Sequence, residues 1–222
     1  MTPADLERLV EAKAARRAVA HCTWLRTGEQ IVMERDDAAP DALADALAVR
    51  FRSGRSGIEA VEGDEVFVRV HVPSPRLVAI GAVHISQALA RIAALAEFDV
   101  LVVDPRTAFA TPERFDGVRL VAEWPEREIL RLDPYTALAA LTHDPKIDDE
   151  PLAWALEAGC FYVGALGSRK THEKRLTRLR ERGVDQGTLD RVHAPIGLDI
   201  GAASPQEIAV AVMAEVIATL RR

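Results

Sequence analysis

The sequence predicts an α/β protein in which a mostly parallel sheet carries helices on both faces and follows a smaller α+β domain. Two observations support this fold class. From Arg76 onward β-like and helical segments alternate, which is the pattern of parallel sheets with crossover helices. Before Arg76 the chain shows short strand-like runs and two helical stretches in a less regular order. We therefore expect a small N-terminal α+β domain at residues 1–75 and a parallel-sheet domain at residues 76–222.

The clearest unit of the second domain is a predicted strand–helix–strand segment from Arg76 to Asp104. A short apolar run stops at Gly81, a helical stripe of apolar residues follows, and a second apolar run stops at Asp104. Asp104 lies 23 residues after Gly81, close to the roughly 20-residue offset of the ribose-binding acid in dinucleotide folds. We therefore predict a Rossmann-type domain with Gly81 in its first strand-to-helix turn and Asp104 at the tip of the next strand.

The turn itself departs from the dinucleotide fingerprint G-x-G-x-x-G/A. Gly81 is present, and Ser86 is small enough for the third position, but Val83 stands where the second glycine is needed. We expect the branched side chain of Val83 to resist positive φ and to fill space that a pyrophosphate would use. The sequence thus predicts the fold together with weak binding of NAD(P).

The remaining elements are predicted from periodicity, caps and turn residues. In the first domain we expect helices at 6–13 and 41–51 and strands at 19–25, 30–34, 58–61 and 65–72. In the second we expect strands at 119–123, 136–141 and 160–163, a short helix at 125–132, a basic helix at 169–182, a short helix around Leu189 and a last helix opened by a capping box of Ser204 and Glu207. A further helix through Ala158 is expected to be capped by Asp148 or Asp149, with Pro151 in its first turn.

Composition narrows the class of partners. The 222-residue chain has a formal charge of −6 and a pI near 5.6, which argues against nucleic acid or an anionic membrane as the main partner. No apolar stretch approaches the roughly 18 residues of a membrane span, and the first residues lack a signal-peptide pattern. Cys22 and Cys160 stand far apart, so we expect neither a disulfide framework nor a zinc ribbon but two small buried residues. The expected location is cytoplasmic.

Ligands of open α/β sheets bind beyond the carboxyl ends of the strands. We therefore expect cofactor-binding residues in the loops that follow the predicted strands and in the loop 193–201, which has no predicted strand of its own. These candidates are Gly81, His84, Asp104, Arg106, Thr142, His143, Asp144, Gly164, Ala165, Gly167, Ser168, Arg169, Gly197, Asp199 and Gly201.

Three of these features allow two interpretations each. The turn from Gly164 to Arg169 is either an anion cradle or a plain strand-to-helix turn with Ser168 as N-cap. His143 beside a carboxylate is either an acid–base pair or a hydrogen-bonded loop histidine. The basic helix is either a solvated face or a patch for a phosphate-bearing ligand or an acidic partner. The histidines lack the short spacing of metal ligands, and we assign no catalytic or metal-binding residue.

Five segments, taken together, resemble the XdhC/CoxI family, the accessory proteins of xanthine dehydrogenase and related molybdenum hydroxylases. They are Val103–Arg106, Phe109–Phe115, Leu141–Lys146, Tyr162–Arg169 and His193–Gly201, and they follow one another in the order found in the family. The resemblance implies a Rossmann domain beside an N-terminal domain, often in a homodimer. It also implies a chaperone that binds molybdenum cofactor (molybdopterin), protects it during sulfuration by a partner such as a cysteine desulfurase, and helps insert it into the apo-hydroxylase.

The sequence departs from the family pattern in its first domain. Longer members carry a Gly-Gly-Cys segment there, and residues 1–75 contain none, so a cysteine contact to the cofactor is in doubt and Cys22 is a weak substitute. Two other functions stay open. An NAD(P)-dependent oxidoreductase would use Asp104 for ribose and His143 as acid–base, and a nucleotide-sensing module would regulate a partner. No hydride-transfer pattern such as Tyr-x-x-x-Lys accompanies the predicted Rossmann unit, which favours the chaperone.

Overall fold

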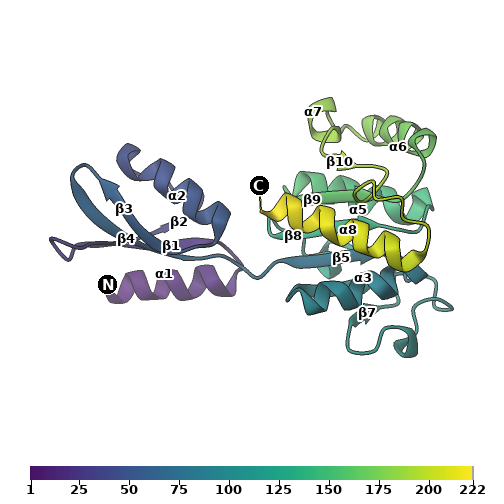
Figure 1. Ribbon diagram of the computed structural model, residues 1–222, viewed down its shortest axis with the longest axis horizontal. Helices are drawn as coiled ribbons and strands as arrows, with labels where there is room; N and C mark the ends of the chain where they lie inside the picture. The colour runs from purple at the N-terminus through teal and green to yellow at the C-terminus, as the bar shows by residue number, and fades with distance from the viewer. Residues whose placement is uncertain (222) are drawn as a thin grey trace. The chain divides into compact units, whose positions relative to one another are not determined.

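The computed structural model describes residues 1–221, and these form two compact units (Figure 1). The division along the chain falls between Pro73 and Ser74. Within residues 1–221, no helix combines the length and the apolar character needed to cross a lipid bilayer.

The N-terminal unit is a four-stranded antiparallel sheet with two helices. Its strands are β1 (Val19–Trp24), β2 (Gln30–Glu34), β3 (Gly57–Val61) and β4 (Asp64–His71) in the order β2-β1-β4-β3, and its helices are α1 (Pro3–Ala14) and α2 (Asp41–Ser53). Figure 1 shows the two helices on opposite sides of this sheet. Val66, Val68 and Val70 of β4 are buried and alternate with exposed residues, because successive side chains of a strand point to opposite faces.

The second unit is built on a six-stranded sheet in which every pair of neighbours is parallel. The strands are β5 (Arg76–Ile80), β6 (Asp99–Val103), β7 (Arg119–Val121), β8 (Thr136–Ala140), β9 (Tyr162–Ala165) and β10 (Val192–His193), in the order β10-β9-β8-β5-β6-β7. Counted within this unit from the β7 edge, the order is 3-2-1-4-5-6, the doubly wound order of a Rossmann-type sheet. The crossover direction therefore reverses between β5 and β8, and the fold predicted from the βαβ segment is confirmed.

Helices cover both faces of this sheet. They are α3 (His84–Leu95), α4 (Arg127–Leu130), α5 (Pro145–Glu157), α6 (Arg169–Glu181), α7 (Gln186–Leu189) and α8 (Pro205–Leu220), with a 3₁₀ turn η1 at Pro112–Arg114. Alternate strand residues divide between two cores: Leu77 and Ala79 pack toward α3 and α8, whereas Val78 and Ile80 pack toward α5 and α6. Each strand is thus apolar on both faces, which explains the continuous apolar runs of the sequence.

The start of α5 differs from the prediction. The helix begins at Pro145 with Asp144 as its N-cap, and the Asp144 side chain accepts a hydrogen bond from the Lys146 N–H at 2.9 Å. Proline at the first helical position and a capping carboxylate start the helix one turn early. The predicted caps, Asp148 and Asp149, instead lie buried inside the helix, and Pro151 is an interior residue rather than part of the first turn.

Two further boundaries lie in the C-terminal third. The strand predicted at 160–163 is β9 at Tyr162–Ala165, and the loop predicted without a strand contributes the two residues of β10. The capping box of α8 is confirmed: Glu207 accepts a hydrogen bond from the Ser204 N–H at 2.9 Å, and Ser204 Oγ accepts one from the Glu207 N–H at 3.2 Å.

Candidate functional site

The loops after β5 and β8 meet at the carboxyl edge of the sheet, where the crossover direction reverses. Gly81 ends β5 with φ of +108°, and a Cβ on it would lie 2.6 Å from Thr142 Cγ2. Only a residue without a side chain allows this backbone conformation and this approach. The first glycine of the predicted turn therefore brings two candidate residues together at the position where doubly wound sheets bind ligands.

Asp104 lies at the tip of β6 as predicted, but its carboxylate is already fully engaged. The side chain is buried, and its oxygens accept hydrogen bonds from the Ala82 N–H at 2.7 Å, from the Arg106 N–H at 2.9 Å and from the Arg106 guanidinium at 2.8 and 2.9 Å. Burial raises the pKa of Asp104, but these bonds outweigh burial and hold the pKa below its usual value. A ribose hydroxyl would have to compete with four internal donors for this carboxylate.

Val83 does not occupy the turn in the way that the sequence predicts. Its φ is −92°, an ordinary extended value, and its side chain packs against the core cluster on the α3 side of the sheet. The argument that a branched residue resists positive φ here is therefore wrong, because the position does not need positive φ. Ser86 is buried and donates its hydroxyl hydrogen bond to the Gly81 carbonyl, and His84 is exposed at the start of α3.

The loop after β8 holds Thr142, His143 and Asp144. Thr142 Oγ1 donates to Asp148 Oδ1 at 2.7 Å and accepts from the Asp144 N–H at 3.0 Å. His143 is exposed and has φ of +64°, a left-handed conformation that costs energy for a residue with a side chain. Its Nδ1 would lie 3.8 Å from a Cβ on Gly167, so the β8 and β9 loops are neighbours.

The turn after β9 is shorter than the predicted cradle. Gly164 and Ala165 lie within the parallel ladder, and a Cβ on Gly164 would clash with Ile196 and Tyr162 at 2.7 Å. The turn proper begins at Leu166 and contains Gly167, with φ of +137°. Ser168 is the N-cap of α6 and accepts a hydrogen bond from the Thr171 N–H at 3.3 Å, whereas Arg169 is exposed. Ser168 therefore acts as the predicted N-cap.

The loop 193–201 is fastened to α8 by Glu215. The Glu215 carboxylate accepts hydrogen bonds from the Tyr162 hydroxyl at 2.6 Å and from the Gly197 N–H at 2.8 Å, and it lies 3.0 Å from His193 Nδ1. Gly197 has φ of +91°, and a Cβ on it would lie 2.9 Å from the Val212 nitrogen. Gly197 thus packs the loop onto the helix, while Asp199 and Gly201 are exposed.

A pocket between α5 and α6 contains two charged residues that the sequence patterns did not single out. Asp148 is 1% exposed and Arg175 is 2% exposed, and both line a cavity of about 270 Å³ together with His143. Burial raises the pKa of Asp148 to about 6, although the Thr142 hydrogen bond and the charge of Arg175 oppose this. Burial likewise lowers the pKa of Arg175.

The sequence did contain a signal for Arg175. It precedes Leu179 by four residues, and residues at this spacing share one face of a helix. Because Leu179 is apolar and fully buried, Arg175 on the same face is buried with it. The interpretation of the basic helix as a uniformly solvated face overlooked this stripe.

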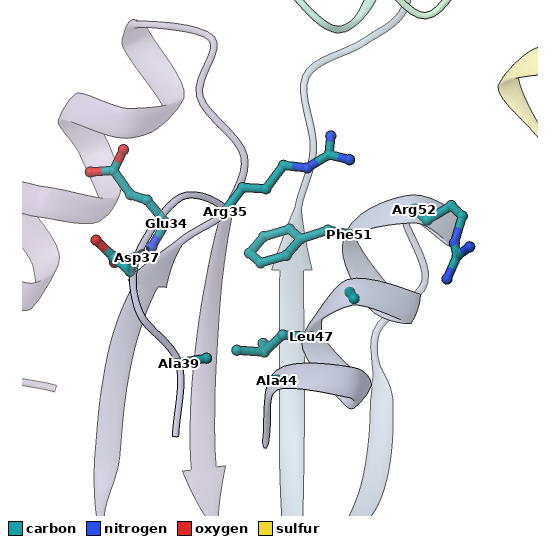
Figure 2. Close-up of a pocket in the computed structure, with 9 residues that line it drawn as sticks. Glu34, Arg35, Asp37, Ala39, Ala44, Leu47, Phe51 and Arg52 are labelled. Carbon is teal, nitrogen blue, oxygen red and sulfur yellow. Dashed lines mark hydrogen bonds between the residues drawn. The ribbon is translucent and has the colours of Figure 1, made fainter. Parts of the chain in front are cut away.

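Other features are less suited to a site. In the N-terminal unit a cavity of about 460 Å³ lies beside α2, and Figure 2 shows Leu47 pointing toward Ala39 there. Its carboxylates, Glu34 and Asp37, are paired with Arg8. Within residues 1–221, no three His, Cys, Asp or Glu side chains are grouped so as to hold a metal ion.

Both cysteines are buried. Cys22 lies in β1 and Cys160 precedes β9, and neither side chain is exposed. Burial raises the pKa of the Cys22 thiol to about 11 and that of the Cys160 thiol to about 12.

Comparison with known proteins agrees with this geometry. Residues 77–216, which contain the whole parallel sheet apart from Arg76, match the family model described as the XdhC Rossmann domain. The chain belongs to the XdhC family. The resemblance that the five segments carry is thus confirmed, and the matched range includes every candidate site residue.

Three curated relatives of this XdhC-family chain cover its larger part. Over 181 residues it is 38% identical to the Escherichia coli protein YqeB, described as uncharacterized, covering 75% of this chain and 32% of the relative. It is 31% identical to a Bacillus subtilis protein described as a probable xanthine dehydrogenase subunit, covering 71% and 46%. It is 32% identical to the molybdenum cofactor insertion chaperone PaoD of Escherichia coli, covering 65% and 40%. The chain thus spans less than half the length of each of these relatives.

A solved structure shares the fold of this XdhC-family protein. It is a Bacillus halodurans protein described as a xanthine dehydrogenase, which aligns with a TM-score of 0.63 at 23% identity and covers 97% of this chain and 63% of its own. At this identity the likeness concerns the fold.

Proposed function

We propose that this protein is an accessory chaperone that binds molybdenum cofactor, assists its sulfuration and supports its insertion into a molybdenum hydroxylase such as xanthine dehydrogenase. The observation that carries the proposal is the meeting of the family segments at the switch point: Gly81 touches Thr142, and His143 lies beside Gly167. One relative is named as a molybdenum cofactor insertion chaperone and another as a probable xanthine dehydrogenase subunit, which supports the same role.

The cargo has two ends with different needs. Its phosphate carries negative charge, and its metal–dithiolene end is reactive. We propose that the start of α6, with Arg169, attracts the phosphate, since cations and free N–H groups at a helix start favour anions. Thr142, His143 and Asp144 lie one loop away and orient the other end in this proposal, while the loop up to Gly201 covers it. Such holding needs no turnover.

The same geometry gives less support to a dinucleotide enzyme. The carboxylate expected to bind ribose is the buried Asp104, whose oxygens are occupied by Arg106 and the Ala82 N–H. The protein partner in our proposal is an apo molybdenum hydroxylase. A cysteine desulfurase as sulfur source and a homodimer as the working form complete the proposal.

The function is tested in a strain that expresses a molybdenum hydroxylase with and without this protein. We expect the protein to raise hydroxylase activity and molybdenum content without changing the amount of hydroxylase polypeptide. A fully loaded and active hydroxylase in the strain lacking this protein would contradict the proposal.

Arg169 provides a test at residue level. Arg169→Ala should weaken cofactor retention by about 1.5–3 kcal/mol if the guanidinium makes a charged hydrogen bond to the phosphate. Retention is measured by native mass spectrometry of protein from a molybdenum-replete host. The matched control is Arg180→Ala on the same helix, because Arg180 bonds Gln186 instead of facing the turn. Equal losses in both variants would show that only overall charge matters.

A further inference from the structure

The pocket between α5 and α6 contains a buried cation whose hydrogen bonds the fold does not complete. Arg175 donates from Nη2 to the Leu166 carbonyl at 3.0 Å. Its Nε and Nη1 atoms are buried and have no hydrogen-bond partner among residues 1–221. Asp148 lies close enough for its charge to act on the guanidinium, but its Oδ2 is also without a partner in this part of the chain.

A neighbouring pair on the same two helices shows what a completed arrangement looks like. Arg178 of α6 donates from Nε and Nη2 to the two carboxylate oxygens of Asp149 of α5, at 2.5 and 3.0 Å. Asp148 and Arg175 make no such fork. Leaving buried guanidinium N–H groups unpaired is costly, so an unpaired set facing a cavity indicates a ligand that supplies acceptors.

The cavity has the size and charge for a small anion. Its volume of about 270 Å³ lies below the roughly 300–1,000 Å³ of pockets that enclose whole drug-sized ligands. Lys170, Lys174, Arg175 and Arg178 line it against two carboxylates, so the cations exceed the anions by two when both carboxylates are ionised. A guanidinium presents two parallel N–H groups that match two oxygens of a phosphate.

We propose that this pocket binds a phosphate group, with Nε and Nη1 of Arg175 as its buried donors and Lys170 and Lys174 at its rim. Placing the phosphate end of the molybdenum cofactor there rests on the function proposed above. Binding of inorganic phosphate does not, because it depends only on the charge and geometry of the pocket. His143 lines the same pocket and belongs to the β8 loop, so a phosphate held here lies beside the candidate site.

The test uses the full chain and inorganic phosphate at pH 7.0, with chloride at equal ionic strength as the reference salt. Phosphate binding is measured by calorimetric titration and by the shift in melting temperature. We expect saturable binding and a phosphate-specific rise in melting temperature. Arg175→Met should weaken binding at least tenfold, Arg175→Lys should bind with intermediate affinity, and the control Arg180→Met should change affinity less than twofold.

Stability separates a ligand role from a structural role. Without phosphate, Arg175→Met should melt at or above the temperature of the wild type, because an apolar side chain replaces an unpaired buried charge. If Arg175→Met does not fold, the Arg175→Lys variant and the phosphate-specific shift of the wild type decide the question. The proposal is overturned if phosphate stabilises no more than chloride, or if the Arg175 variants bind phosphate as the wild type does.

Native mass spectrometry of protein from a molybdenum-replete host distinguishes the two proposals. Arg175-dependent phosphate binding without retained cofactor would support the anion site and contradict the chaperone function. Retained cofactor that is unaffected in Arg175→Met, together with no phosphate binding, would support the function and contradict this site. Retained cofactor that is lost in Arg175→Met would identify the phosphate as part of the cargo.

Discussion

Asp148 shows how a single buried carboxyl can set the pH dependence of folding. Its pKa rises from the usual 3.8 to about 6 because the side chain is buried. Since the folded-state value lies above the unfolded one, the native protein holds this proton longer. The contribution of Asp148 to stability therefore becomes less favourable as pH rises from about 4 to about 6 and is constant above that.

The amide variant Asp148→Asn tests this dependence. An amide does not ionise and can still accept the Thr142 hydrogen bond, so the free energy of unfolding of the variant should gain on that of the wild type between pH 4 and 6. A shift of this size corresponds to about 3 kcal/mol at most. Urea unfolding at several pH values measures the difference, with the exposed Asp116→Asn as control. A difference that does not change across this window would contradict the prediction.

Gly81 provides a second test at the residue scale. Gly81→Ala places a Cβ 2.6 Å from Thr142 Cγ2 at a φ of +108°, and strain and overpacking together should cost about 2–4 kcal/mol. The matched control is Gly117→Ala, where φ is +71° and no atom lies within 4 Å, so about 1 kcal/mol is expected. The free energy of unfolding in urea measures both. Adding Thr142→Ser should restore part of the loss, and equal costs at Gly81 and Gly117 would rule out the close approach.

The limits of the sequence are also seen at this scale. Gly81 and Asp104 were placed correctly because strand ends, turn glycines and helix spacing are local signals. The position of Arg175 was missed because a charged side chain on a basic helix normally faces solvent. Its burial depends on α5 packing against α6, which is a tertiary contact. The predicted ribose contact of Asp104 omitted the internal partner Arg106, two residues further along.

At the scale of elements, the loop 193–201 depends on one side chain of α8. Burial alone would raise the pKa of Glu215, but hydrogen bonds from His193, Tyr162 and the Gly197 N–H outweigh it and hold the pKa below the usual 4.5. The stabilisation is therefore present at neutral pH and is lost as pH falls through the folded-state pKa. This single carboxylate joins β9, β10 and the loop to the last helix.

Glu215→Gln should loosen this loop without unfolding the domain. The amide loses the charge and directs two N–H groups at existing donors, so the loop should open more often. We expect the Leu198 and Gly197 amides to exchange roughly ten- to a hundredfold faster, as for the loss of one or two kcal/mol of charged hydrogen bonding. Hydrogen exchange measured by mass spectrometry reports this, with Thr219→Ala on the same helix as control. Unchanged exchange in the loop would show that Glu215 does not hold it.

The element boundaries show which signals are local and which are not. The β2 strand and the capping box of α8 were predicted correctly from alternation and cap residues. The start of α5 was misplaced because two acidic residues and two prolines offer alternative caps, and only packing decides between them. The two residues of β10 have no pattern of their own, and they form a strand because β9 provides a partner.

At the scale of the whole molecule, the second unit contains its own core. Both core clusters of the parallel sheet are made of residues from 77 to 220. We predict that a fragment of residues 74–222 folds alone and unfolds cooperatively in urea, as judged by near-ultraviolet circular dichroism. The fragment should also retain phosphate binding, since every residue that lines the pocket belongs to it. A fragment without fixed tertiary structure would contradict this.

The two buried cysteines have a consequence for how sulfur is handled. A protein that passes sulfur along needs an accessible thiolate that can carry it as a persulfide, and the thiols of Cys22 and Cys160 are enclosed and protonated at neutral pH. In the proposed function this chain therefore does not relay sulfur, and the donor must deliver it directly to the held cargo. Iodoacetamide should accordingly leave both cysteines unmodified in the native protein at pH 8 and modify both in urea. The bound cargo then has to expose its metal end to a second protein while its phosphate stays enclosed.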